Sequence, residues 1–365
     1  MVDNKNMALT PFNIVKRSCL GIDIGSSTIK IVELSRIGER IKLEAYGEIK
    51  AEMIYNKPFR TLERNTIQFQ TMDVARAVAG IVNEAKMVSR KAIFSIPDFS
   101  TFYTVFDLPP MSFQELSQAV RFQARQQIPV PLNEVSLDWS VIKGQAGDFR
   151  GSGLKILLVA VPNEVIHQYQ EIARIAKLDL LALEAEVFGF LRVAYTDKVK
   201  TMAIIDIGDQ STTCSLVNKG VLKFSRSFEP AGNEITEVLS KALQIDLKEA
   251  KIIKEKYGLL PTQEPGKQSV AEVIRTIVDS MLMEVEKTFQ GFAADDGEAL
   301  ELVILGGGVA LIPGLKDYFA EKLKKQVEII NSFSKVFYPP LLEKTLKQLS
   351  PCYAIAVGSA MRGLE

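Results

Sequence analysis

Two similar stretches far apart in the chain, GIDIGSSTI at 21–29 and IIDIGDQST at 204–212, constrain the fold most strongly. In each stretch an apolar strand carries a single aspartate and then reaches a glycine that is followed by polar residues, including serine and threonine. In the first, apolar and polar residues alternate on both sides of the turn, which predicts a β-hairpin. Because 365 residues are too many for one core and suit two domains, the repeat predicts one α/β fold used twice.

The remaining pattern extends this plan. After the first hairpin we expect a strand near 40–50, a helix at 74–87 and a strand at 91–97. The second hairpin, at 201–217, is followed by mostly helical residues at 232–292, a strand, glycine turn and helix at 301–324, and a closing helix at 353–364. Residues 181–196 are expected to form a helix that connects the two halves.

A separate unit is inserted between the halves. Strands at 101–108, 137–142 and 155–162 alternate with helices to predict a β-α-β-β-α module. Its first helix should begin with a capping box of Ser112 and Glu115. Its second helix carries the single histidine, His167, with Asn163 as the expected N-cap. We interpret His167 as an ordinary helix residue, so the chemistry must work without a histidine-activated nucleophile.

The hairpin turns carry the residue types that bind phosphate. Turns of glycine and serine expose backbone N–H groups and hydroxyls that can cradle an anion, and Gly25 lets the backbone approach it closely. Asp23, at the end of its strand, could hold a hydrated Mg²⁺, which keeps most of its waters and needs only one or two carboxylates. The second hairpin offers Asp206, Gly208, Ser211 and Thr212 for the same task. Two facing turns would hold a polyphosphate between two lobes.

A third motif, LGGGVALIPGL, follows in the last quarter of the chain. A strand that runs into Gly306, Gly307 and Gly308 and then into a helix lets the backbone pass close to a flat ligand such as adenosine. The chain has no GxxxxGK[ST] and no GxGxxG after a strand, so it has neither a P-loop nor a Rossmann fingerprint. Each motif alone is weak, but the three together in this order favour a nucleotide cleft.

Composition excludes several other classes of protein. The chain has 44 acidic and 44 basic residues, without the basic excess typical of nucleic-acid binders. Its three cysteines, Cys19, Cys214 and Cys352, are far apart, which argues against a zinc site or a disulfide framework and fits a reducing compartment. No apolar run approaches the roughly 20 residues of a membrane span, and the polar tail at 1–17 is not a secretory signal.

These motifs resemble the actin, chaperone and sugar-kinase ATPase superfamily. Within it the chain is similar over about 18–365 to the PilM family of type IV pilus assembly proteins, relatives of the division protein FtsA. The match rests on GIDIGSSTIKIVEL, IIDIGDQSTTCSLV and LVILGGGVALIPGL, and on the connecting helices EAEVFGFLRVA and YAIAVGSAMRGL. The most family-specific stretch is AVRFQARQQIPVPLNEVSLDW at 119–139.

The resemblance implies a two-lobed actin-like (duplicated ribonuclease H-like) fold with Mg-ATP in its cleft and at most slow ATPase activity. Asp23 and Asp206 would coordinate the metal, and Glu186 would orient the attacking water, although Val187 replaces the usual proline. The phosphates would lie against Ser26, Ser27, Thr28 and Lys30. The adenosine would border Gly306 to Gly308. Lys254 matches the ribose motif AE-x-x-K, but Lys251 stands in place of its glutamate.

The resemblance also implies a domain division and partners. We expect subdomain 1A at 18–98 with 182–200 and 352–365, an inserted subdomain 1C at 99–181, subdomain 2A at 201–231 with 301–351, and subdomain 2B at 232–300. The implied partner is the N-terminal cytoplasmic peptide of PilN, an inner-membrane pilus protein, bound between 1A and 1C. The protein would thus be cytoplasmic and peripheral to the inner membrane through its partner, without inserting itself. Pilus assembly ATPases and a second copy of the chain are further implied partners.

Two alternatives stay open at this stage. An FtsA-like, polymer-forming division protein would share the fold, but the chain stops at Glu365 without the linker and amphipathic helix that end FtsA. A small-molecule kinase of the same superfamily would need a carboxylate base beside the acceptor hydroxyl. No sugar-recognition stretch is visible for that role.

Overall fold

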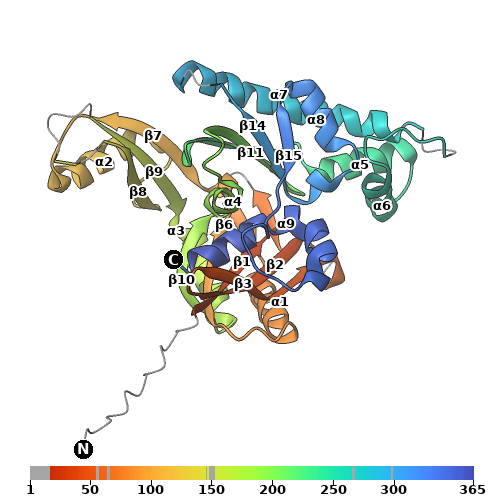
Figure 1. Ribbon diagram of the computed structural model, residues 1–365, viewed down its shortest axis with the longest axis horizontal. Helices are drawn as coiled ribbons and strands as arrows, with labels where there is room; N and C mark the ends of the chain where they lie inside the picture. Colours follow the sequence, from red (N-terminus) through yellow and green to blue (C-terminus); the bar gives the residue numbers. More distant parts are fainter. Residues whose placement is uncertain are drawn as a thin grey trace, which may run out of the picture.

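The computed structural model describes residues 17–54, 57–63, 66–144, 146–147, 153–264, 268–296 and 299–365. Two five-stranded sheets lie one above the other, and a smaller module stands to one side (Figure 1). The first sheet has the order β3 (Arg40–Lys50), β2 (Thr28–Ile37), β1 (Arg17–Ile24), β6 (Lys91–Ile96), β10 (Asp179–Ala185). The second has the order β13 (Val221–Phe228), β12 (Thr212–Asn218), β11 (Thr201–Ile207), β14 (Leu302–Gly306), β15 (Gln326–Ile329).

The two sheets repeat one topology. In each, three antiparallel strands form a meander, and two further strands run parallel to the first of them. In β1–β2 Asp23 pairs with Lys30, and in β11–β12 Asp206 pairs with Thr213 at the equivalent register. The prediction of one α/β fold used twice is confirmed.

Helices cover the outer faces of both sheets. On the first sheet, α1 (Thr71–Glu84) and α3 (Asn163–Ile175) share one apolar core with the isoleucines of β1 and β2. On the second sheet, the core is built with α5 (Gly232–Leu243), α6 (Leu247–Tyr257), α7 (Val270–Asp296) and α8 (Leu315–Leu323). Strands with apolar residues on both faces need such double cover.

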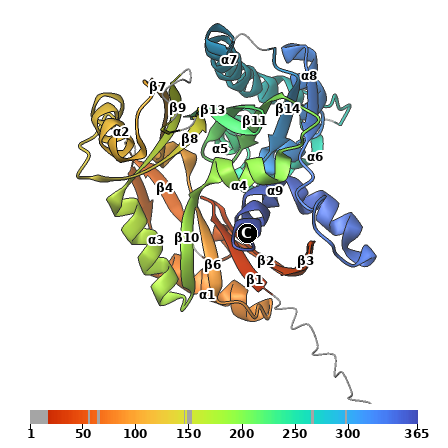
Figure 2. The same cartoon turned by 60° about the vertical axis from the view of Figure 1, so that its left-hand side comes forward.

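Two helices fill the space between the sheets. Figures 1 and 2 both show α4 (Glu186–Ala194) and α9 (Glu343–Arg362) between them. Their buried side chains join residues of β1, β2, β11 and β14 in a single apolar cluster. This packing fixes the angle at which the two sheets face each other.

The inserted module is a three-stranded antiparallel sheet with one helix of its own. The order is β7 (Phe102–Leu108), β9 (Leu154–Pro162), β8 (Val135–Lys143), so β8 is an edge strand. Helix α2 (Phe113–Gln127) begins with the predicted capping box and buries Leu116, Val120 and Ala124 against one face of this sheet. Helix α3, expected to close the module, packs with α1 on the first large sheet.

Short elements complete the fold. A β-ribbon of β4 (Arg60–Glu63) and β5 (Thr66–Phe69) precedes α1. The 3₁₀ turns are η1 (Ala51–Met53), η2 (Asp98–Ser100), η3 (Gly308–Leu311) and η4 (Pro340–Leu342). In the part of the chain described, no helix has both the length and the apolarity to cross a bilayer.

Three local predictions were wrong. Residues 181–196 do not form one helix, because β10 runs to Ala185 and α4 begins at Glu186. Parallel pairing of β10 with β6 overrides the helix propensity of the Leu-Ala-Leu-Glu sequence. Asn163 does not cap α3 but is its first residue, and its side chain instead bonds Ser136 and the carbonyl of Asn133. The closing helix begins at Glu343, ten residues before the predicted start at 353.

That early start places Pro351 inside α9. A proline normally interrupts a helix because it lacks an N–H and crowds the preceding turn. Here Ser350, Pro351 itself and the residues from Tyr353 to Met361 are buried, and tertiary packing holds the helix together. The predicted tail at 1–17 lies outside the described residues apart from Arg17, which begins β1. The division into named subdomains stays a prediction.

Candidate functional site: a cleft between the two hairpins

A cavity of 410 Å³ lies between the two sheets, and both hairpin turns border it. Most residues singled out from the sequence line this one cavity. They are Asp23, Gly25, Ser26, Ser27, Thr28, Lys30, Glu186, Asp206, Gly208, Ser211, Lys254, Gly307 and Gly308. The fold therefore brings together side chains that are nearly 300 positions apart in the sequence.

Two predicted residues do not line the cavity. Thr212 is fully buried, and its hydroxyl donates to the carbonyl of Pro230 at 2.6 Å. Gly306 faces Phe190, and a Cβ there would lie 2.5 Å from the ring. Both positions support the walls of the site.

The two hairpin turns have the same geometry. The N–H of Gly25 donates to the carbonyl of Thr28 at 3.0 Å, and the N–H of Gly208 donates to that of Ser211 at 3.0 Å. A Cβ on Gly25 would lie 2.7 Å from the Thr28 carbonyl oxygen, so only glycine fits. Each turn thus directs small polar residues at the cavity from its own lobe.

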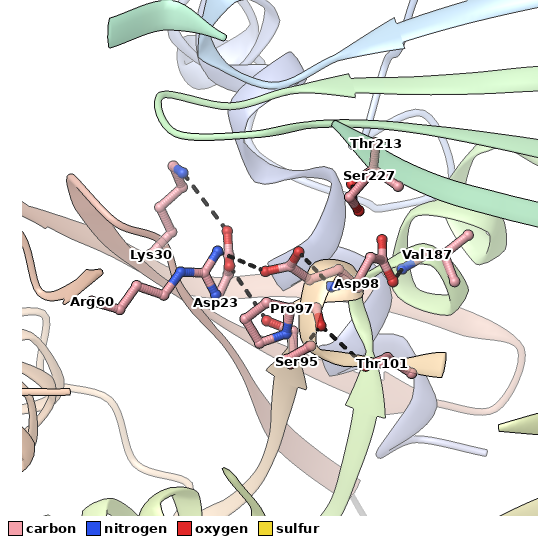
Figure 3. A network of polar contacts seen from close by, with 12 residues as sticks. Asp23, Lys30, Arg60, Ser95, Pro97, Asp98, Thr101, Val187, Thr213 and Ser227 are labelled. Atoms are coloured by element: carbon pink, nitrogen blue, oxygen red, sulfur yellow. Dashed lines mark hydrogen bonds and ion pairs between the residues drawn. The ribbon is translucent and has the colours of Figure 1, made fainter. Parts of the chain in front are cut away.

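The two aspartates end their strands at the floor of the cavity. Asp23 lies 3.7 Å from the Lys30 ammonium, and its other oxygen accepts a hydrogen bond from Ser95 at 3.3 Å (Figure 3). Burial, together with the carboxylates of Glu186 and Asp23, raises the pKa of Asp206 to about 7. The pocket therefore concentrates negative charge that a cation would stabilise.

Glu186 lies in the first turn of α4, beside Asp23. One of its oxygens accepts a hydrogen bond from Arg60 at 3.1 Å, and the other accepts one from the N–H of Asp98 at 3.4 Å. Asp98 in turn accepts hydrogen bonds from the N–H of Val187 and from the Tyr103 hydroxyl. Burial raises the pKa of Glu186, although Arg60 opposes the shift.

Arg60 and Asp98 belong to this network, but the sequence analysis missed both. Asp98 directly follows the strand end at Pro97, where parallel strands deliver side chains to one edge of a sheet, and this signal could have found it. Arg60 stands in a short β-ribbon whose sequence carries no motif.

Gly307 and Gly308 of the glycine triplet border the cavity on the side of the second lobe, beside Asp206. Gly307 has φ +82°, and a Cβ there would lie 2.3 Å from the Ile207 carbonyl oxygen. Its N–H donates to the carbonyl of Pro351 in α9 at 2.9 Å, which ties the turn to the connecting helix. Gly308 has open space where its Cβ would be. A flat group can approach the backbone here.

Lys254 lines the cavity near the second hairpin turn, since its partner Gly232 donates its N–H to the carbonyl of Gly208. The side chain is buried, and its ammonium donates to the carbonyl of Gly232 and to the hydroxyl of Thr236, both at 2.9 Å. Burial lowers the pKa of Lys254. The ammonium thus holds α6 against the start of α5.

A second cavity, of 750 Å³, separates the inserted module from the first lobe. One wall is the face of the small sheet opposite α2, where Ser136, Asp138 and Ser140 of β8 pair with the valines and leucine of β9. The other wall comes from β10 and α4 and includes Phe188 and Arg192. Helix α4 thus borders both cavities, with Glu186 in the first and Phe188 in the second.

Comparison with known proteins identifies the family. The model of the family described as type IV pilus assembly protein PilM matches residues 21–364. The chain belongs to the PilM family. Among solved structures, the chain in the "PilM-PilN type IV pilus biogenesis complex" is similar at a TM-score of 0.81, with 23% identity over 95% of this chain and 98% of that one.

More distant relatives share the architecture. The cell division protein FtsA of Enterococcus faecalis is 21% identical over 85% of this chain and 78% of its own length. MreB 5 of Spiroplasma citri, solved with AMPPNP, has a TM-score of 0.53 and 14% identity over 94% of this chain and 95% of its own. The PilM family chain therefore has the actin-like fold expected from its motifs.

Proposed function

We propose that this protein is an ATP-binding adaptor of the type IV pilus inner-membrane assembly platform that binds the N-terminal cytoplasmic peptide of PilN. The observation that carries the proposal is the pair of matching turns on one cavity, Gly25–Thr28 and Gly208–Ser211, in a chain of the PilM family. The similar MreB 5 structure contains AMPPNP, and the similar PilM structure is a complex with PilN.

The nucleotide would span the cavity from the hairpins to the glycine triplet. Ser26, Ser27 and Lys30 would bind phosphate from the first lobe, and Gly208 and Ser211 from the second. The adenosine would lie against Gly307 and Gly308, where a side chain would occupy its space. Glu186 would orient water, and its pairing with Arg60 favours slow turnover.

The donors present fit a magnesium ion. Among the described residues, no group of three or more His, Cys, Asp and Glu side chains could hold a metal. Asp23 is buried and Asp206 is half-buried, and both carboxylates line the same cavity. This pair suits Mg²⁺, which keeps waters and phosphate oxygens as its other ligands. When bound, Mg²⁺ would neutralise phosphate charge.

The peptide would lie in the second cavity. β8 is the edge strand of its sheet, so an extended peptide could add main-chain hydrogen bonds along it while apolar side chains enter the groove. Arg192 and Arg362 line the same groove, but both are paired with Glu184, so the apolar wall and the strand edge would carry most of the binding. Binding of PilN would place this protein in the cytoplasm, peripheral to the inner membrane. The pilus family match favours this reading over an FtsA-like polymer or a kinase.

Thermal unfolding with Mg-ATP tests the nucleotide part. A ligand at 100 times its Kd adds about 2.7 kcal/mol to the free energy of unfolding, and in a domain of this size each kcal/mol raises the Tm by about 2–4 °C. We therefore expect Mg-ATP to raise the Tm by about 5–10 °C. In Asp23→Ala or Asp206→Ala, the part of this rise that depends on magnesium should be lost. An unchanged melting curve at millimolar Mg-ATP would refute the proposal.

Titration with a synthetic PilN N-terminal peptide tests the partner. Val159→Glu puts a charge on the groove wall and should abolish binding. Phe122→Glu makes the same kind of change on the exposed side of α2, outside the groove, and should leave binding intact. If both variants bound the PilN peptide with the same affinity, this groove would not be the peptide site.

A further inference from the structure

Arg60 is a buried guanidinium on the nucleotide cavity. It begins β4, is 8% exposed, and its charged end lies over the ring of Phe99 at 5.6 Å from the centroid. Figure 3 shows the side chain of Arg60 beside Asp23, and its Nη2 lies 3.1 Å from a carboxylate oxygen of Glu186. Burial opposes its charge, but Glu186, Tyr169 and Asp23 outweigh that effect and raise the pKa of Arg60. Arg60 is therefore charged.

This side chain has hydrogen-bonding capacity left over. Nη2 donates to Glu186, whereas Nη1 is buried and has no hydrogen-bond partner within the described residues. A guanidinium offers five N–H donors, and a buried donor without an acceptor is unfavourable. Nη1 itself is closed off from solvent, so a ligand in the cavity would meet the guanidinium through its other N–H groups.

Four lysines line the cavity, and two of them have other partners: Lys254 bonds Gly232 and Thr236, and Lys251 forms an ion pair with Glu52 at 3.5 Å. Lys30, assigned above to the phosphates, also pairs with Asp23, and Lys50 is exposed. Arg60 differs from them because its planar fork can hold a carboxylate on one side and an oxyanion on another.

The position of Arg60 fixes which part of a nucleotide it can reach. Asp23 and Glu186 are its neighbours in the first lobe, whereas Gly307, Gly308 and Lys254 belong to the second lobe. The residue before it, Phe59, donates its N–H to the carbonyl of Ser26 in the first phosphate turn at 2.8 Å. Arg60 is thus attached to the turn that would hold the phosphates.

We propose that the Arg60 guanidinium binds the terminal phosphate of a nucleoside triphosphate while it holds Glu186 in place. The inference rests on the proposed nucleotide site and assigns to Arg60 the distinction between triphosphate and diphosphate. A diphosphate has no group at that position, so it gains nothing from Arg60. Arginine suits this contact because its hydrogen bonds to phosphate are charge-assisted and can be bidentate.

Calorimetric titration of the full chain with Mg-AMPPNP and Mg-ADP tests the inference. We expect the parent chain to prefer Mg-AMPPNP. Arg60→Gln should weaken Mg-AMPPNP binding about tenfold or more, as for a lost hydrogen bond to a charged group, and change Mg-ADP binding by less than about threefold. Arg60→Lys keeps the charge but not the fork and should recover only part of the preference.

Because Arg60→Gln leaves Glu186 buried without its partner, the same comparison is made in a second background. Glu186→Gln, which keeps Arg60, is compared with the double variant Glu186→Gln/Arg60→Gln. The double variant removes both charges, so neither is left buried without its partner. The preference for Mg-AMPPNP should persist in the first and disappear in the second. Arg76→Gln, on the exposed side of α1, is the control and should change neither affinity.

Each other outcome has a definite meaning. Equal loss of affinity for both nucleotides would show that Arg60 is only a structural counter-ion of Glu186, and would overturn the inference while the nucleotide site stands. A retained preference in the double variant would overturn it in the same way. Absence of binding of either nucleotide to the parent chain would overturn the proposed function and this inference together.

Discussion

Gly189 of α4 and Gly358 of α9 touch backbone to backbone where the two connecting helices cross. A Cβ on Gly358 would lie 1.8 Å from the carbonyl oxygen of Gly189. Such a contact is possible only because neither residue has a side chain, and it sets how closely the helices pack between the sheets.

Gly358→Ala should therefore destabilise the protein although alanine favours helices. Overpacking of a core costs about 1–3 kcal/mol. The matched control is Gly80→Ala in α1, where nothing lies within 4 Å of the added Cβ and a gain of about 0.5–1 kcal/mol is expected. Urea denaturation measures both, and a gain in both variants would show that α4 and α9 can separate without cost.

The Asp98–Glu186 pair should make stability depend on pH. Burial and the neighbouring Glu186 raise the pKa of Asp98 well above its usual value, although hydrogen bonds from Tyr103 and Val187 oppose the shift. Since the folded state holds the proton more tightly, this contribution is fully present below the unfolded pKa of about 3.9 and is lost as the pH rises through the raised folded value.

Asp98→Asn mimics the protonated carboxyl at every pH and keeps an acceptor for the Val187 N–H. Its free energy of unfolding, relative to the parent chain, should therefore rise between pH 5 and pH 8. Asp107→Asn, on an exposed position of β7, is the control. A pH-independent difference for Asp98→Asn would contradict the prediction.

Gly307 and Gly308 should respond differently to a side chain. Gly308→Leu meets open space, so the Tm of the free protein should change little while nucleotide binding is lost. Gly307 has φ +82°, and an alanine there would also meet the backbone of Ile207, so Gly307→Ala should lower the Tm of the free protein. Melting curves with and without Mg-ATP separate the two effects. Normal nucleotide stabilisation of Gly308→Leu would exclude the adenosine from this side.

Ser112→Ala should cost about 1 kcal/mol of stability, because it removes the N-cap of α2. Ser117→Ala, at an exposed position inside the same helix, should be neutral or slightly stabilising. Denaturation monitored at Trp139, on the sheet against which α2 packs, reports on this module. Equal effects of the two substitutions would mean that the capping box contributes nothing.

Local patterns were sufficient for the elements whose signals lie within a few residues. The hairpin at 21–29, its copy at 204–212 and the capping box of Ser112 could be predicted because alternation, turn glycines and cap chemistry act between near neighbours. Repetition of the hairpin was also enough to predict the duplicated fold. Asp23, Asp206 and the glycine triplet could be placed near one another because both halves follow one plan.

Only the tertiary structure decided what depends on contacts between distant segments. β10 is a strand because β6 offers a parallel edge, and α9 continues through Pro351 because two sheets enclose it. Arg60 joins the cleft because Glu186, 126 positions away, accepts its hydrogen bond. No local pattern encodes such a pairing, since a buried charge is stabilised by whichever partner the fold delivers to it.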